Sequence, residues 1–486
     1  MRIGGLASGM DIDQLVNKLM AAERMPLDRM EQDRTTLTWK RDSFRDINKS
    51  LLELDEMMYN MKLSTTYKTK LVSSSQEGAV TATGSTSSTN GTYNIAVTQL
   101  ASSAIRTGEL DIDPDKLLKE VDIDLGSEIK FSTYDEKEGN MVEHTVQVTD
   151  EDTLNSILNK INKEDKNVRA FYDSQSKKVF LETTRTGDYN KDGAEIVFDK
   201  SPLFVQNLNL GEEKGGKDAI FTYNDVEMTS KDNSYKLNGI TFQFKNVTDG
   251  SATLTVKNDA DAAFDSIMKF IDKYNEVVEK LNGTQQEEKY RDYKPLTEEQ
   301  KKEMSEDEIE LWEEKAKSGI LRGESAISDG LFAMRRSWYA NVKTGGKITS
   351  LTQLGITTSS DYLDGGKLIV KDEAKLKEAL RNDPDNVYKL FSNDVEGDDR
   401  GIINRLDDAI TSTINKIEER AGKGYHTLEN YTLGKQMKSL NKQIDAFEDR
   451  LVQVENRYWS QFTAMEKAIQ RMNQQSTYLM QQFGGQ

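Results

Sequence analysis

Residues 433–486 read LGKQMKSLNKQIDAFEDRLVQVENRYWSQFTAMEKAIQRMNQQSTYLMQQFGGQ, and apolar side chains recur in this stretch at two positions of a seven-residue repeat. One position holds Leu433, Leu440, Phe447, Val454, Gln461, Ala468 and Gln475, and the other holds Met437, Ile444, Leu451, Tyr458, Met465, Met472 and Leu479. No proline interrupts the repeat. A seven-residue spacing held this long predicts an α-helix that packs against another helix in a left-handed supercoil.

The N-terminal segment carries a second pattern of this kind. Its first residues predict an amphipathic helix that Asp11 or Asp13 caps, with one face formed by Ile12, Leu15, Val16 and Leu19. Pro26 predicts an interruption or a restart of this helix, because proline has no backbone N–H to donate. Beyond it, a heptad repeat places Met30, Leu37, Phe44, Leu51 and Met58 at one position and Ile47, Leu54 and Met61 at the other.

The middle of the chain has the period of β-strands. Between residues 72 and 258, apolar and polar side chains alternate in short runs such as EIKFSTYD at 128–135 and ATLTVKN at 252–258. One amphipathic helix, DTLNSILNKINKE at 152–164, is embedded among these runs. From residue 259 onward the helical period returns, so the strands are inserted between two helical regions.

These periods predict an α+β multidomain fold, with terminal helices forming a coiled-coil or helical-bundle leg and two β-rich head domains inserted between them. The expected parts are a terminal coiled-coil leg (1–45 plus 433–486), a helical leg domain (46–71 plus 259–432), one β-rich head domain (72–104 plus 221–258) and a second (105–220). The alternative is that each terminal helix packs on its own local domain.

The composition argues against several classes of function. A formal net charge of −18 disfavours nucleic acids and anionic membrane surfaces as partners. The chain has no cysteine, and its two histidines, His144 and His426, lie far apart in the sequence. The sequence contains no run of 18 apolar residues, so we expect no transmembrane helix. Because no catalytic constellation is visible, we expect a structural or binding protein without enzyme activity or cofactor.

One acidic turn has the spacing of a calcium-binding loop. Asp188, Asn190, Asp192 and Asp199 supply oxygen ligands, which suit a hard cation. The flanking residues read as strands, however, and Glu195 stands where such a loop usually has an apolar residue. A plain hairpin turn is therefore the alternative to a calcium site.

The C-terminal repeat predicts an interaction surface. Its methionines and glutamines make an adaptable seam rather than a locked dimer, so the helix suits ordering by other subunits or by a chaperone. The residues expected to mediate assembly are Ile12, Leu15, Leu19, Met30, Leu37, Phe44, Leu51, Leu440, Ile444, Phe447, Leu451, Val454, Tyr458, Met465, Met472 and Leu479.

Several stretches resemble the family of bacterial flagellar filament cap proteins, also called flagellar hook-associated protein 2. GLASGMDIDQLVNKLMAAERMPLDRM at 5–30 resembles the N-terminal signature of this family, and RYWSQFTAMEKAIQRMNQQSTYLMQQF at 457–483 resembles its C-terminal half. Residues 153–187 resemble the insertion module shared by flagellins and hook proteins. Residues 293–323 are similar to those of Gram-positive, Bacillus-like members.

This resemblance implies a helical leg with two β-rich heads and a ring, commonly a pentamer, at the distal tip of the filament. The ring would help flagellin fold and insert next to filament or hook–filament junction subunits. The resemblance also implies an extracellular location, export by the flagellar type III pathway without a cleaved signal peptide, and a cytoplasmic chaperone on the C-terminal helix. It implies no cofactor. The alternatives are a hook–filament junction or filament protein, which would form open polymers, and a secreted adhesin whose head binds glycans.

Overall fold

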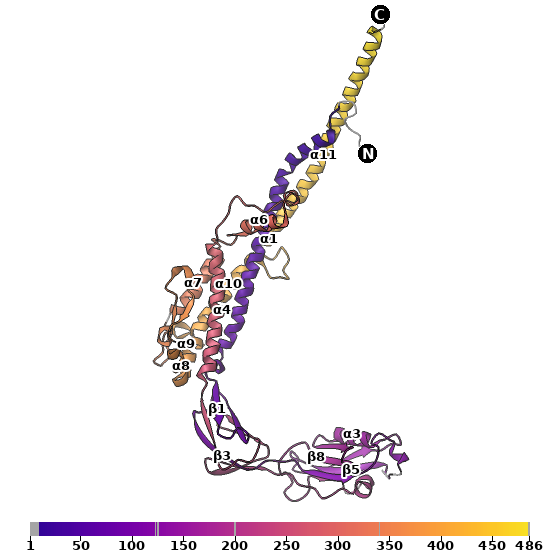
Figure 1. Ribbon diagram of the computed structural model, residues 1–486, viewed down its shortest axis with the longest axis vertical. Helices are drawn as coiled ribbons and strands as arrows, with labels where there is room; N and C mark the ends of the chain where they lie inside the picture. Colours follow the sequence, from indigo (N-terminus) through magenta and orange to yellow (C-terminus); the bar gives the residue numbers. More distant parts are fainter. Residues whose placement is uncertain (1–8, 122, 124–125, 199–200, 340, 485–486) are drawn as a thin grey trace. The chain divides into compact units, whose positions relative to one another are not determined.

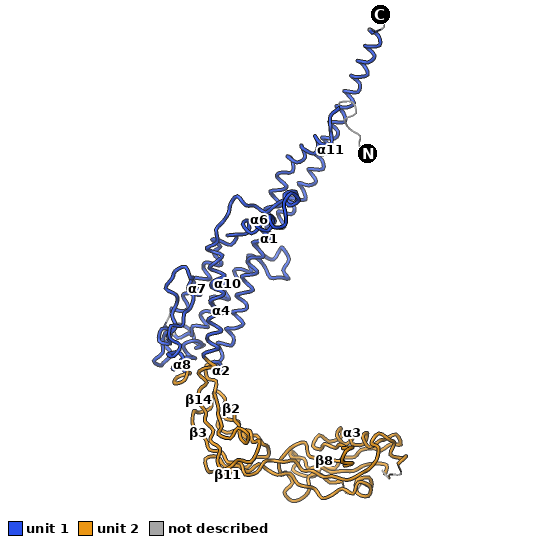
Figure 2. The backbone as a smooth tube through the Cα atoms, in the orientation of Figure 1, with its two compact units in different colours: residues 1–66, 264–379, 385–486 blue, residues 67–263, 380–384 orange. Residues whose placement is uncertain are grey.

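The computed structural model describes residues 9–121, 123, 126–198, 201–339 and 341–484 (Figure 1). The chain divides into two units, which Figure 2 shows in blue and orange. Unit 1 comprises residues 1–66, 264–379 and 385–486, and unit 2 comprises residues 67–263 and 380–384. Helices from both ends of the chain thus belong to the same unit.

Helices dominate unit 1. They are α1 (Ile12–Lys62), α4 (Ala260–Gln286), α5 (Glu298–Lys302), α6 (Glu306–Lys317), α7 (Ser325–Tyr339), α8 (Glu373–Asn382), α9 (Pro384–Ser392), α10 (Ile402–Ala421) and α11 (Thr432–Phe483), and the short α2 (Ser64–Tyr67) follows α1. A hairpin of β15 (Ile356–Thr358) and β16 (Leu368–Val370) completes the unit. α1 packs against α10 and α11, and α10 also packs against α7.

Helix α1 corrects one expectation from the sequence. Its N-cap is Asp11, whose side chain accepts a hydrogen bond from the backbone N–H of Gln14 at 2.9 Å. The helix then continues through Pro26, so the predicted interruption is wrong. A proline inside a helix costs about 3 kcal/mol. Burial of neighbouring side chains such as Leu27, which is only 2% exposed, opposes that cost and keeps the helix continuous.

Antiparallel sheets build unit 2. One sheet has the strand order β1-β14-β3-β10-β11, and a second has the order β12-β13-β2. Their strands are β1 (Lys70–Ser74), β2 (Val80–Gly84), β3 (Gly91–Gln99), β10 (Ala219–Tyr223), β11 (Val226–Ser230), β12 (Ser234–Leu237), β13 (Ile240–Phe244) and β14 (Ala252–Asn258). Side chains from both sheets, among them Ile95, Phe221 and Phe242, share one core.

Two further sheets and a helix enclose another core of unit 2. The sheets have the orders β4-β8-β7 and β6-β5-β9. The elements are β4 (Ile105–Glu109), β5 (Glu128–Asp135), β6 (Asn140–Gln147), α3 (Leu154–Glu164), β7 (Val168–Asp173), β8 (Lys178–Thr183) and β9 (Ile196–Val197). A capping box between Thr153 and Ser156 begins α3, and Ile157 and Ile161 of α3 join the core.

The predicted fold class is confirmed, because long terminal helices pack together and small β-sheets lie between them in the sequence. Most residues of the leg helices fall in unit 1, but the first residues of α4 and residues 380–384 fall in unit 2. The finer division of the leg, and the boundaries of the two head domains near residues 105 and 220, remain predictions.

Candidate assembly surfaces

Helices α1 and α11 run antiparallel, side by side in Figure 1. The Tyr458 hydroxyl donates a hydrogen bond to Glu23 Oε1 at 2.8 Å, and this bond raises the pKa of Tyr458. Nearer the other end of the pair, the Arg45 guanidinium lies 5.5 Å from the centre of the Tyr431 ring. Residue numbers therefore rise along α1 as they fall along α11, as expected for two terminal heptad segments that meet.

Burial of the predicted assembly residues falls toward the end of α11. The buried members are Ile12, Phe44, Leu51, Ile444 and Val454, and the partly buried members are Leu19, Met30, Leu37, Leu440, Phe447, Leu451, Tyr458 and Met465. The exposed members are Leu15, Met472 and Leu479. The predicted set thus combines a packed seam with a surface that the described residues leave exposed.

The last turns of α11 carry that uncovered surface. Every residue from 470 to 482 is exposed. Met472, Tyr478 and Met480 expose 62%, 61% and 72% of their surface, and Leu479 exposes 51%. Clustered apolar side chains of this kind mark interaction sites on soluble proteins. The arrangement can therefore bind another apolar helix or groove, but it offers no chemistry for catalysis.

Polar contacts hold α1 against α10. Arg45 Nε donates to the backbone oxygen of Ala421 at 3.0 Å, and Arg45 Nη2 donates to that of Lys423 at 3.0 Å. These carbonyls lie at the C-terminal end of α10, where a cation is favourable. The contacts of Arg45 therefore hold α1 against the C-terminal end of α10.

Glu324, just before α7, links α1 and α10 to the start of α7. It pairs with Lys40 of α1 and accepts a bond from Arg420 Nη2 of α10 at 2.8 Å. Burial by itself raises the pKa of Glu324, but the hydrogen bonds from Lys40 and Arg420 outweigh it and place the pKa below the usual value. The carboxylate is therefore charged in the folded chain at neutral pH.

Leu27 is a buried residue of α1 that the heptad prediction missed. It is buried, as is Val16 of the predicted first amphipathic face. The two residues are 11 positions apart, which is close to three turns of an α-helix. The expected interruption at Pro26 hid this spacing.

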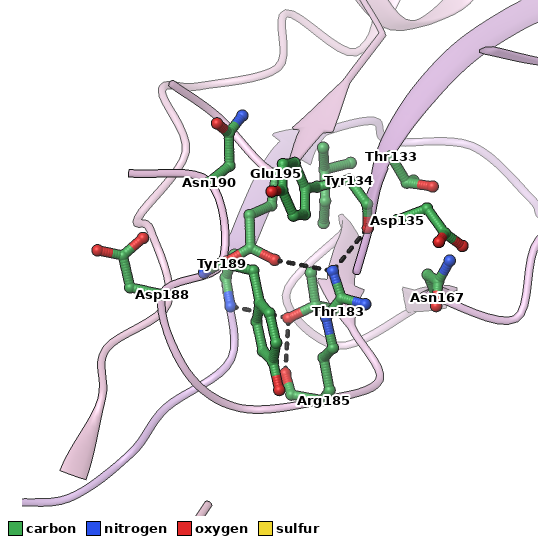
Figure 3. A network of polar contacts seen from close by, with 12 residues as sticks. Thr133, Tyr134, Asp135, Asn167, Thr183, Arg185, Asp188, Tyr189, Asn190 and Glu195 are labelled. Atoms are coloured by element: carbon green, nitrogen blue, oxygen red, sulfur yellow. Dashed lines mark hydrogen bonds and ion pairs between the residues drawn. The ribbon is translucent and has the colours of Figure 1, made fainter. Parts of the chain in front are cut away.

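The predicted calcium turn lies between β8 and β9, and Figure 3 shows its surroundings. Asn190 Nδ2 donates to the backbone oxygen of Ala194 at 2.7 Å, which closes the turn on itself. The side chains of Asp188 and Asn190 do not converge on one point in Figure 3. Asp199 lies outside the described residues. The described side chains therefore add no support to the calcium hypothesis, which stays a prediction.

Glu195 is instead part of a polar network in this turn. Its Oε1 accepts a bond from the backbone N–H of Tyr189 at 3.0 Å, and its Oε2 lies 3.6 Å from Arg185 Nη2 (Figure 3). Arg185 Nη2 also donates to the backbone oxygen of Tyr134 on β5 at 2.6 Å. Glu195 is 2% exposed, so a buried carboxylate paired with Arg185 stands where a calcium loop usually has an apolar residue.

The described residues contain neither a metal-binding cluster nor a membrane-spanning helix. No group of three or more His, Cys, Asp or Glu side chains within the described ranges suits a metal ion. No helix in the described part of the chain is long and apolar enough to cross a membrane.

Comparison with known proteins agrees with this architecture. The pattern for the C-terminus of flagellar hook-associated protein 2 matches residues 216–474, and the N-terminal pattern matches residues 8–104. The flagellin hook IN motif matches residues 128–184, which include α3. The chain and its fold thus define a structural protein of the bacterial flagellum rather than an enzyme.

Individual relatives extend the match along the whole chain. Flagellar hook-associated protein 2 of Halalkalibacterium halodurans is 37% identical over 99% of this chain and 100% of its own length. The protein of that name from Thermotoga maritima is 22% identical over 100% of this chain and 96% of its own length. The chain belongs to the flagellar hook-associated protein 2 family, whose members are flagellar cap proteins.

A solved structure has a related fold. The crystal structure of the D1-D2-D3 domains of the flagellar cap protein FliD from Escherichia coli matches with a TM-score of 0.57. The match covers 82% of this chain and 99% of that chain, at 18% sequence identity. At this identity the likeness concerns the fold alone.

Proposed function

We propose that this chain forms a closed ring at the distal tip of the flagellar filament and helps flagellin subunits fold and insert there. The observation that carries the proposal is the exposed apolar end of α11. Met472, Tyr478, Leu479 and Met480 remain exposed although α1 covers the earlier part of the helix. Such a surface is costly in water and becomes favourable when a neighbouring subunit covers it.

An adaptable end suits a ring that stays in place while the filament grows. Each added flagellin changes the surface beneath the ring, so no single rigid interface serves every step. Methionine side chains re-pack readily against different partners. Met472 and Met480, with glutamines between them, give the end of α11 this property. We propose a pentameric ring whose α11 ends dock anew on filament or hook–filament junction subunits.

The same surface needs protection before assembly. We propose that a cytoplasmic chaperone covers the end of α11, and that the flagellar type III pathway then exports the chain. Both proposals rest on the exposed side chains and on family membership. A pull-down with the chain ending at residue 469 tests the first: loss of chaperone binding supports it, and unchanged binding contradicts it.

A truncation in cells tests the proposed function. A chain that ends at residue 469 loses the exposed end but keeps the buried seam residues Ile444 and Val454. It should fold as before, yet strains that carry it should release flagellin into the medium and lack long filaments. A matched control replaces the exposed residues Gln474 and Gln481 with serine and should grow normal filaments. Filaments of normal length on the truncated chain would contradict the proposal.

A further inference from the structure

A groove of about 740 Å³ opens on unit 1 beside α7. Phe332 and Tyr339 of α7 line it together with Tyr362 and Leu363 from the short turn Tyr362–Asp364. Their exposed fractions are 69% for Phe332, 57% for Tyr339, 80% for Tyr362 and 64% for Leu363. Four large apolar side chains that are exposed together mark a binding surface rather than scattered surface residues.

Two arginines give this groove a positive charge. Arg335 and Arg336 of α7 line it. The Arg335 guanidinium lies 5.8 Å from the centre of the Tyr339 ring and 5.9 Å from that of Tyr362, so the rings hold it in the groove. Within the described residues, neither arginine forms an ion pair with a carboxylate. A chain of net charge −18 thus leaves two cations uncompensated at one apolar surface.

Helix α6 presents the complementary surface. Leu311 is 61% exposed, and Asp307, Glu310 and Glu314 are exposed beside it at helical spacing. Among the described residues, none of these three carboxylates forms an ion pair. The helix therefore carries one apolar side chain surrounded by three uncompensated negative charges.

The opposite side of α6 is fixed to its own chain. Trp312 Nε1 donates to the backbone oxygen of Lys294 at 2.8 Å, and Glu313 lies 3.3 Å from Lys301 and 3.5 Å from Lys317. A capping box between Ser305 and Glu308 begins the helix. Because the contacts to Lys294 and Lys301 orient α6, its Leu311 face stays exposed to a partner.

The groove and α6 both lie near the C-terminal end of α4. Gln285 and Gln286 at that end line the groove. The chain that follows leads directly into the α6 region, where Ser318 Oγ donates to the backbone oxygen of Glu288 at 2.6 Å. α6 contributes no residue to the lining of the groove in its own chain. The groove and α6 are thus separate surfaces of one unit, and a second copy can bring its α6 to the groove.

We propose that α6 of one copy docks in the α7 groove of the neighbouring copy. Leu311 enters beside Phe332, and the carboxylates of Glu310 and Glu314 face Arg335 and Arg336. Such a head-to-tail contact uses two different surfaces, and it closes into a ring when the rotation divides a full turn. This inference rests on the ring of the proposed function and assigns the surfaces that join its subunits.

Cysteine cross-linking tests the contact, because the natural chain has no cysteine. The full chain with L311C and F332C is expressed in a strain that lacks its own copy, and sheared flagella are oxidised and probed with an antibody against the chain. The matched control joins L311C to V395C, since Val395 is 42% exposed on unit 1 outside the groove. Because all three positions are exposed, the substitutions leave folding intact.

We expect a ladder of cross-linked multimers only for L311C with F332C. Normal filaments without that ladder, or an equal ladder for the control pair, would overturn the inference and leave the proposed function intact. Normal filaments in the strain that lacks the chain would instead overturn the proposed function.

Charge reversal gives an independent readout. In sedimentation of the purified full chain, E310K with E314K should weaken self-association roughly tenfold, because charges of like sign then face each other. R335E with R336E should do the same. All four substitutions together restore opposite charges and should recover most of the association. Failure of the four substitutions to recover it, or no effect of either pair alone, would contradict the contact.

Discussion

A leucine-to-alanine substitution at Leu51 should lower stability but permit filament assembly, whereas the same substitution at Leu479 should leave stability unchanged but impair assembly. Leu51 of α1 is 0% exposed, whereas Leu479 of α11 is 51% exposed. Truncation of a fully buried leucine removes its transfer free energy and leaves a cavity, which costs about 2–5 kcal/mol. At an exposed helix position the same change costs less than about 0.5 kcal/mol.

Tryptophan fluorescence during urea unfolding measures this difference in unit 1 alone. All four tryptophans, Trp39, Trp312, Trp338 and Trp459, belong to unit 1, so unfolding of unit 2 does not obscure the signal. Leu51→Ala should lower the free energy of unfolding by about 2–5 kcal/mol. Leu479→Ala should leave it within about 0.5 kcal/mol of the natural value.

Filament growth supplies the second half of the test. Leu479→Ala combined with Met480→Ala should shorten filaments although the purified protein is as stable as the natural chain. Leu51→Ala should support assembly at temperatures at which its unit 1 stays folded. The reasoning is refuted if the Leu479 variant loses more than about 1 kcal/mol of stability, because the residue would then be packed within its own chain.

Three further predictions concern stability and binding. Glu324→Gln should lower the stability of unit 1 by about 1–3 kcal/mol at pH 7. The folded pKa of Glu324 lies below its unfolded value, so its contribution to stability is present above about pH 4.3 and disappears as the pH falls through the folded pKa. Urea unfolding at several pH values should therefore show the difference in unfolding free energy between the natural chain and the variant shrink as the pH falls. Gly422→Ala should lower the free energy of unfolding by about 1–3 kcal/mol, because Gly422 has φ of +68° and a Cβ there would lie 2.4 Å from Tyr431 Cδ1. Thermal unfolding measures this loss, and an unchanged unfolding temperature would contradict the close approach of Gly422 to Tyr431. Millimolar calcium should give no heat in calorimetry, and heat that D188N with D192N abolishes would establish the calcium site instead.

The sequence predicted the leg well because its helices repeat regularly. The heptads of α11 required a helical partner, and α1 with its own heptads is that partner. The capping boxes at Thr297 and Ser305 begin α5 and α6 as their spacing indicates. Such local signals depend on residues only a few positions apart, so they can be read without a structure.

Surfaces formed by distant residues could not be predicted in this way. The groove combines Phe332 with Tyr362 and Gln286, and no sequence period links these positions. Likewise, the heptad pattern does not distinguish Val454, which is buried, from Met472, which is exposed. Pro26 misled the prediction because tertiary packing outweighs the local cost of one proline.

Hydrogen exchange at residues 470–483 tests the central claim most directly. The amides of this segment should exchange quickly in the purified monomer and slowly in caps on filaments. Slow exchange in the monomer would mean that the end of α11 is already covered within its own chain. Equally fast exchange in the assembled cap would mean that no neighbouring subunit covers it, and either result would contradict the account.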